Sequence, residues 1–222
     1  MIRRHKTKWT CRAIVAVLGV TWLAFPVGCT VFGIRTSEEA SYNVLREEGH
    51  IELREYDEVV VAETIVKADF DEAGGIAFRR LFNYISGANA AQTKIAMTAP
   101  VLADPAEATE GDKIPMTTPV LGQKQDDGWR YMFVLPATYT KDSAPTPTDP
   151  AVRLVSVPRK KVAALRYLGS WSEQSMDENS QELLEWIETN GLATASAPRA
   201  AGYDPPWTIP FLRRNEVLID IE

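Results

Sequence analysis

The sequence predicts an α+β fold, a pseudo-twofold distorted β-barrel of about eight or nine strands with two main α-helices outside it. Three observations support this prediction. The order strand, strand, helix, strands occurs twice along the chain. A nine-residue motif is repeated within the first half. The composition, 45% hydrophobic and 24% charged, is that of an ordinary globular domain with a real core.

Residues 1–28 have a different composition from the rest of the chain. Five Lys and Arg side chains, and no acidic one, lie in the first twelve residues. They precede the apolar run Ala13–Val27, which is shorter than the roughly 20 residues of a membrane span. A basic start followed by a short apolar run predicts a secretory signal peptide and therefore an exported protein.

Gly28-Cys29 at the end of this run resembles a bacterial lipobox, in which the cysteine carries lipid after cleavage. Pro26 departs from the aliphatic residue usual there, and an uncleaved anchor is the alternative. We expect lipidation of Cys29, a tether over residues 29–49 and a folded domain over 50–222. The other cysteine, Cys11, also precedes the domain, so no disulfide or Cys-ligated metal is expected within it.

The charge of the chain limits its partners. The formal charge is −6, and loss of the five leader cations makes it −11. Such a surface repels nucleic acid, and we expect no nucleic-acid partner. Membrane attachment is expected through the N-terminal lipid or anchor, because an acidic surface is not attracted to anionic lipids.

The first half of the domain contains two predicted strands and a helix. His50–Tyr56 alternates apolar and polar residues, and Val59–Val66 is β-branched, with a turn at Asp57-Glu58 between them. Lys67–Gly87 is a predicted helix that Asp69 or Asp71 caps. Its core face comprises Ala77, Leu81, Tyr84 and Ile85.

A repeated motif follows this helix. Lys94–Leu102 and Lys113–Leu121 are identical at seven of nine positions, at an offset of 19 residues. Two copies are too few for a solenoid. They predict two strands of a hairpin joined by the polar segment Ala103–Asp112, although a proline near each end argues against a central strand position.

The second half repeats the order of the first. Trp129–Leu135 is a predicted strand and Tyr139–Pro150 a loop. Arg153–Val157 and Lys161–Leu168 predict a hairpin that turns at Pro158-Arg159. The remaining predictions are a helix with Ser172 as its N-cap, an extended segment and a final strand, at Ser172–Asn190, Pro198–Pro210 and Glu216–Ile221.

Several motifs together resemble the SOUL/haem-binding protein family. These are the KIxMTxPV pattern of the repeat, Leu135-Pro136, Gly202–Pro206 and Arg213–Val217, and the match covers about residues 49–222. The resemblance implies a distorted barrel with two helices. It also implies binding of haem or another tetrapyrrole.

The domain contains one histidine, His50. In some animal members of the family the ligand to haem iron lies in an Arg-His-Tyr run of the first strand. Here that run is Arg54-Glu55-Tyr56, so Glu55 occupies the position. His50 lies five residues upstream and on the opposite face of the strand, so we expect no axial histidine and no metal site.

Other family members bind tetrapyrroles in an apolar groove without an axial histidine. Here the resemblance implies a groove between the first helix and the repeated strands. Phe78 and Phe82 share one helix face, and thioethers adapt to flat ligands. Adjacent arginines could pair with propionates. The predicted ligand-binding residues are Phe78, Phe82, Arg79, Arg80, Met97 and Met116. Alternatively, the apolar members fill the core and the arginines are a solvated edge.

We therefore expect a non-catalytic protein that binds haem, another tetrapyrrole or another apolar small molecule, and that folds without haem. The sequence contains no phosphate loop and no GxSxG motif. One alternative is a GyrI-like effector-binding module, some of which hydrolyse small molecules; another is a structural envelope protein. For Arg213, Arg214 and Glu216 in the tail we expect ion pairing that joins the last strand to the sheet.

Overall fold

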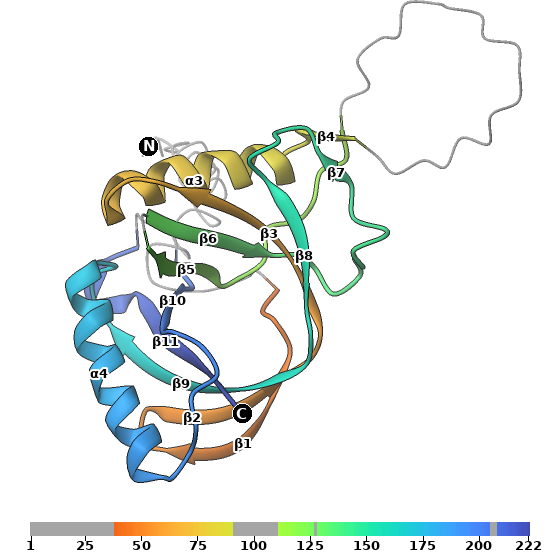
Figure 1. Cartoon of the computed structure of the whole chain (residues 1–222). Coiled ribbons are helices and arrows are strands. Elements are labelled where there is room, and N and C mark those ends of the chain that lie inside the picture. The colour runs from red at the N-terminus through yellow and green to blue at the C-terminus, as the bar shows by residue number, and fades with distance from the viewer. Residues whose placement is uncertain (1–37, 91–110, 127, 205–207) are drawn as a thin grey trace, which may run out of the picture.

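A computed structural model describes residues 38–90, 111–126, 128–204 and 208–222. Nine antiparallel strands form one sheet in the order β1-β2-β9-β11-β10-β5-β6-β3-β8, which curls into a half-barrel (Figure 1). Its strands are β1 (Tyr42–Glu48), β2 (Ile51–Tyr56), β3 (Val59–Val66), β5 (Val120–Gln125), β6 (Gly128–Val134), β8 (Arg153–Val157), β9 (Lys160–Leu168), β10 (Arg199–Gly202) and β11 (Arg214–Ile221). The predicted α+β barrel is confirmed.

Two helices, α3 (Phe70–Ile85) and α4 (Glu173–Thr189), cover the outer face of the sheet (Figure 1). α3 packs on β3 and β6, and α4 packs on β9 and β11. The predicted caps are present: the Asp69 side chain accepts from Glu72 N at 3.0 Å, and Ser172 Oγ accepts from Ser175 N at 3.2 Å. The remaining short elements are β4 (Asn89–Ala90), β7 (Thr146–Pro147) and the 3₁₀-helix η1 (Pro210–Leu212).

Alternation along the strands separates an outer core from an inner face. In β3, Val60, Ala62 and Val66 belong to the cluster that packs against the helices. Val61 lies on the inner face with Met132 and Val134 of β6. The period of two therefore also places Glu63 on the inner face, where the half-barrel is concave.

The predicted hairpin of residues 153–157 and 161–168 is wrong. β8 pairs with β3, whereas β9 pairs with β2 and β11, so these consecutive strands lie in different halves of the sheet. Pro158-Arg159 is therefore a crossing between the halves. A short polar connection has the same sequence character whether the chain turns back or crosses, which is why local patterning failed here.

Most of the second repeat copy is not a strand, contrary to prediction. Only Val120 and Leu121 belong to β5. Pro115 and Pro119 cannot donate to a ladder, and the remaining backbone groups bond elsewhere: Ile114 N donates to Ile85 O at 2.8 Å. The first copy, Lys94–Leu102, lies outside the described residues.

β1 lies within the segment expected as a tether. It pairs with β2 at the edge of the sheet, and all of its residues except Tyr42 are exposed. An exposed edge strand has no buried face, so its sequence lacks the alternation by which strands are recognised. Residues 1–28 lie outside the described residues, and no helix in the described segments is long and apolar enough to cross a membrane.

The short strand β10 joins the two halves by pairing with both β11 and β5. The Trp171 ring lies over Gly202 of β10, where an added Cβ would come within 2.7 Å of the ring. Only glycine fits this position without displacing Trp171. At the strand that connects the two halves, the Trp171 indole ring therefore packs directly on the backbone of β10.

Candidate functional site

An exposed aromatic pair lies on α3. The Phe78 and Phe82 rings are nearly parallel, at 12°, with centroids 5.7 Å apart. They are 41% and 45% exposed, and Phe78 also contacts Phe133 of β6 edge-on at 5.6 Å. The Phe78–Phe133 contact anchors the pair on the core, while the outer surface of the pair remains open to a flat apolar ligand.

Two arginines flank this pair. Arg79 is exposed, and Arg80 is half-buried with Nη1 3.4 Å from Thr64 Oγ1. We call Phe78, Arg79, Arg80 and Phe82 the outer ledge. Met116 is 37% exposed, on the segment that continues from Ile114 beside the end of α3. Met97 lies outside the described residues, as does Cys29.

His50 lies away from the outer ledge. It is exposed, and its Nε2 is 2.7 Å from Glu182 Oε1 on α4, in the other half of the molecule. Glu55 is half-buried, and its Oε2 lies 3.8 Å from Arg159 Nη2. Within the described ranges, no group of three His, Cys, Asp or Glu side chains is arranged to hold a metal ion.

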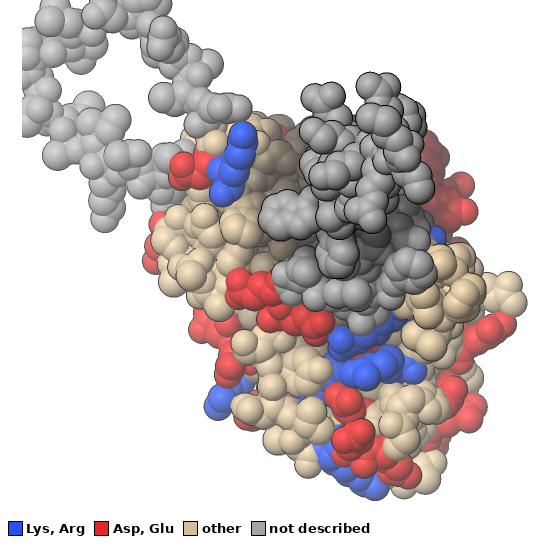
Figure 2. Space-filling view, turned by 180° about the vertical axis from the view of Figure 1, so that it is seen from behind, with Lys and Arg blue, Asp and Glu red and all other residues tan. Residues whose placement is uncertain are grey.

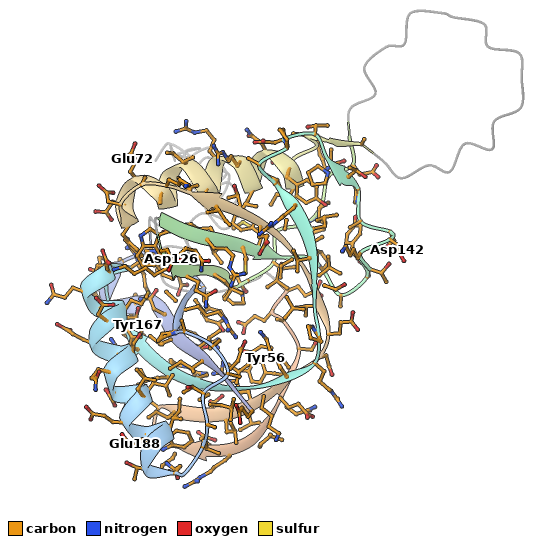
Figure 3. The ribbon with its side chains drawn as sticks, in the orientation of Figure 1. Tyr56, Glu72, Asp126, Asp142, Tyr167 and Glu188 are labelled. Carbon is orange, nitrogen blue, oxygen red and sulfur yellow. The ribbon has the colours of Figure 1, made fainter. Side chains whose placement is uncertain are left out.

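A cavity of about 190 Å³ lies on the inner face, between the two halves of the sheet. Most of its wall is apolar: Ala40, Val59, Val61, Pro119, Leu121, Met132, Val134, Val155, Val157, Pro158, Val162 and Leu218. Tyr56 also lines it, and Figure 3 shows this residue in the hollow between the upper and lower strands. No residue of the outer ledge lines it, because α3 packs on the opposite face of the sheet.

A row of polar side chains crosses seven neighbouring strands at this cavity. We call the row the polar belt; in sheet order it comprises Arg153, Glu63, Arg130, Gln123, Arg199, Asp220 and Lys160. Glu63 Oε1 accepts from Arg153 Nε at 2.5 Å, and its Oε2 lies 3.7 Å from Arg130. The Arg130 guanidinium donates to Gln123, whose register partner on β10 is Arg199.

The belt ends in a second group of charges. Asp220 accepts from both Arg199 and Lys160, the latter at 2.6 Å. Burial and the charge of nearby Arg199 lower the pKa of Lys160. Burial alone would raise the pKa of Asp220, but its bonds to Arg199 and Lys160 lower the pKa overall. The charge of Arg130 also contributes to the lowered Lys160 pKa, so cations from both halves act on one another across the cavity.

A second charged group on the inner face, the locked cluster, comprises Arg54, Tyr203, Arg214 and Glu216. Arg54 and Glu216 are fully buried and form a bidentate pair with distances of 2.6 and 3.0 Å. Glu216 also accepts from Tyr203 at 2.8 Å and from Arg214 at 2.7 Å. The predicted pairing of Arg214 with Glu216 is therefore present, whereas Arg213 bonds the carbonyl of Thr208.

The charges of the locked cluster stabilise one another. Burial opposes ionisation of Glu216, but the bonds and charges of Arg54 and Arg214 outweigh it and lower the pKa of the carboxyl group. Burial and the Glu216 charge raise the pKa of Tyr203 well above its usual value, so the phenol stays a donor. Every member of the cluster thus has a partner of complementary charge or hydrogen-bonding type.

Comparison with known proteins assigns this fold to a family. The family model described as "SOUL heme-binding protein" matches residues 37–220. The chain belongs to the SOUL heme-binding protein family. No match was found among curated proteins. The sheet, the outer ledge and the inner cavity are therefore features of a SOUL domain.

Solved structures share the fold of this SOUL domain at low sequence identity. The C-terminal domain of EcmrR is 14% identical with a TM-score of 0.54, over 82% of this chain and 98% of that one. A hydrolase from Listeria innocua is 16% identical with a TM-score of 0.51, over 80% of this chain and 94% of that one. These similarities establish the fold alone.

The inner cavity of this SOUL domain was not predicted from the sequence. A usable signal was present: Glu63 interrupts the otherwise largely apolar strand Val59–Val66, and Arg130 interrupts the apolar, aromatic strand Gly128–Val134. A charged residue within such a strand points either to an exposed face or to a buried polar site. The pairing of β3 with β6 decides in favour of the buried site, and this pairing is not readable from either strand alone.

Proposed function

We propose that this SOUL domain binds haem or another hydrophobic tetrapyrrole on the outer ledge, without a histidine ligand and without catalysing a reaction on it. The observation that carries the proposal is the stacked pair Phe78–Phe82, which leaves 41% and 45% of these side chains exposed. Large exposed aromatic side chains in adjacent positions mark ligand-binding or interaction surfaces.

The residues of the outer ledge suit this group. A tetrapyrrole offers a flat apolar face, which phenyl rings contact, and propionates, which arginines bind. Arg79 is exposed beside the rings, and the contact of Arg80 with Thr64 is long, at 3.4 Å. When bound, haem would supply its iron chemistry, whereas these side chains would only hold and orient the macrocycle.

Titration of the protein with hemin tests the proposal, with a shifted Soret band as the expected result. Phe78→Ala with Phe82→Ala should weaken binding about tenfold to a hundredfold, because two half-exposed rings contribute together about 1.5–3 kcal/mol. Phe82→Ala alone is the milder variant, since Phe78 also packs on Phe133.

His50→Ala is the matched control, and we expect it to leave the Soret shift unchanged because His50 lies on the other half of the molecule beside Glu182. Loss of the shift in this variant would contradict binding without histidine. An unshifted Soret band at micromolar hemin, or undiminished affinity in the double phenylalanine variant, would remove the outer ledge as the site.

A hydrolase function is the alternative that the solved structures raise. A general base near neutral pH needs a carboxyl group with a raised pKa. The inner-face carboxyls Glu216 and Asp220 have lowered pKa values, because the bonds and charges of their arginine and lysine partners outweigh burial. These carboxylates are suited to fixing cations rather than to accepting protons, which favours a binding function.

We also propose that the protein is exported and anchored by lipid on Cys29. The basic and apolar residues 1–28 and the Gly28-Cys29 pair support this. The intact mass of membrane-extracted protein should show loss of residues 1–28 and a lipid adduct on Cys29. A mass that still includes Met1 and carries no adduct would contradict the proposal.

A further inference from the structure

The inner cavity has an apolar part and a charged part. Apolar side chains from both halves form most of its wall, including Val61 and Val134 from one half and Val162 from the other. Arg130, Lys160 and Arg199 also line it, one cation from each of β6, β9 and β10. A ligand that fills this space must therefore place an apolar body beside a polar group.

Cations outnumber carboxylates in the polar belt. The cavity wall includes three of its cations, Arg130, Lys160 and Arg199, and both of its carboxylates, Glu63 and Asp220, whereas its fourth cation, Arg153, does not line the cavity. The other acidic residue of the wall, Asp57, is exposed and accepts from Arg159 at 3.2 Å. This local excess of positive charge occurs in a chain with a formal charge of −6, and Figure 2 shows acidic side chains spread widely over one face of the molecule.

Arg130 is incompletely bonded. Its guanidinium donates to Gln123, but its contact with Glu63 is long, at 3.7 Å. Its Nε is buried and has no hydrogen-bond partner among the described residues. A buried donor without an acceptor is costly, so an acceptor on a bound ligand would be favoured at this position.

The volume limits the size of the ligand. An apolar cavity of about 150 Å³ accommodates one benzene molecule. The inner cavity, at about 190 Å³, suits a single ring or a short chain with a small headgroup. Drug-sized ligands occupy pockets of about 300 Å³ or more, so a tetrapyrrole is too large for this cavity.

We propose that the inner cavity is a second ligand site, separate from the outer ledge, which binds a small carboxylate with an apolar body. The carboxylate lies at the belt and accepts from Arg130, Lys160 and Arg199, while the apolar body lies against the valine wall. Arginine presents paired donors that match a carboxylate, and the cavity wall offers two such side chains, Arg130 and Arg199.

Three isosteric probes test the sign of the charge that the site recognises. Isothermal titration with 3-phenylpropionate should show binding in the millimolar range expected for a ligand of this size, within a titration to about 5 mM. The neutral 3-phenylpropionamide should bind about tenfold more weakly, and the cationic 3-phenylpropylamine should not bind. Octanoate, which carries the same headgroup on a flexible chain, should also bind.

Two neighbouring lysines provide a matched pair of variants. Lys160→Gln removes a cation from the cavity, whereas Lys161→Gln removes one from the exposed outer side of the same strand. We expect the first to weaken 3-phenylpropionate binding at least about tenfold and the second to leave it unchanged. Arg130→Gln should act like Lys160→Gln, with circular dichroism to verify that each variant is folded.

Several results would overturn the proposal. These are tighter binding of the amine than of the acid, equal binding of the acid by Lys160→Gln and the unsubstituted protein, or no binding of either carboxylate. Saturating 3-phenylpropionate should leave the hemin titration unchanged; competition between them would contradict two separate sites. Because the phenylalanine variants and the lysine variants alter different faces of the sheet, the two proposed sites can fail independently.

Discussion

The locked cluster and the polar belt lie on the same concave face, yet they differ in how completely their charges are satisfied. In the locked cluster, Glu216 accepts from Tyr203, Arg54 and Arg214, with Arg166 Nε at 3.5 Å, and Arg54 donates to the carboxylates of Glu216 and Glu52. In the belt, the buried Nε of Arg130 has no partner within the part of the chain that the structure describes, and Arg153 is 63% exposed. Charged residues of the same types thus stabilise the fold in the locked cluster, where each charge has its partners. In the polar belt, where cations are in excess, they form a ligand site.

Removal of the central carboxylate should have the largest effect. Glu216→Gln leaves Arg54 buried without its main partner, and loss of one member of a buried pair costs about 3–5 kcal/mol. Urea denaturation should show this decrease in the free energy of unfolding. Glu188→Gln, at an exposed position of α4, is the control and should change stability by less than about 0.5 kcal/mol. Equal stability of the two variants would contradict the structural importance of the cluster.

Low pH should reduce the stability that the locked cluster and the polar belt contribute. Glu216 and Asp220 have lowered pKa values in the folded protein, whereas the unfolded chain titrates near 4. As pH falls below about 4.5, the unfolded chain binds more protons than the folded one, so the free energy of unfolding decreases. The urea midpoint at pH 6 and pH 3.5 measures this change.

Asp220→Asn is the variant that separates the belt from the locked cluster in this measurement. It removes one of the two carboxyl groups with a lowered pKa. The urea midpoint of this variant should therefore fall less between pH 6 and pH 3.5 than that of the unsubstituted protein. Identical pH dependence of the two proteins would show that Asp220 does not contribute.

The smallest effect is expected at the exposed end of the belt. Arg153→Ala removes a 2.5 Å contact with Glu63, but the arginine is 63% exposed and solvent screens the pair. Exposed pairs contribute about 1 kcal/mol or less, and Arg130 still neutralises Glu63. A loss of stability as large as that of Glu216→Gln would remove the distinction between the two groups of charges.

Local signals in the sequence predicted the elements well. Asp69 and Ser172 cap the two helices as expected, and β3 and β8 have the predicted bounds, because capping, β-branching and alternation act within a few residues. The pairing of strands was predicted less well. β9 pairs with β2, more than 100 residues earlier, and nothing within either strand specifies that partner.

The candidate sites show the same difference between local features, which were predicted, and long-range features, which were not. Phe78 and Phe82 were grouped correctly on one helix face, since a spacing of four residues is a local property. The belt gathers one residue from each of seven strands, and its members are grouped only by the sheet order. A site composed in this way cannot be found by inspecting neighbouring positions in the sequence.

The position of β11 has a consequence for biosynthesis. This strand follows both β9 and β10 in the chain, but it lies between them in the sheet and carries Glu216 and Asp220. The ribosome therefore delivers Arg54, Lys160 and Arg199 before the carboxylates that neutralise them. Until β11 emerges, Lys160 and Arg199 lack Asp220, Arg54 lacks Glu216, and the edges of β9 and β10 are open to non-native strand pairing.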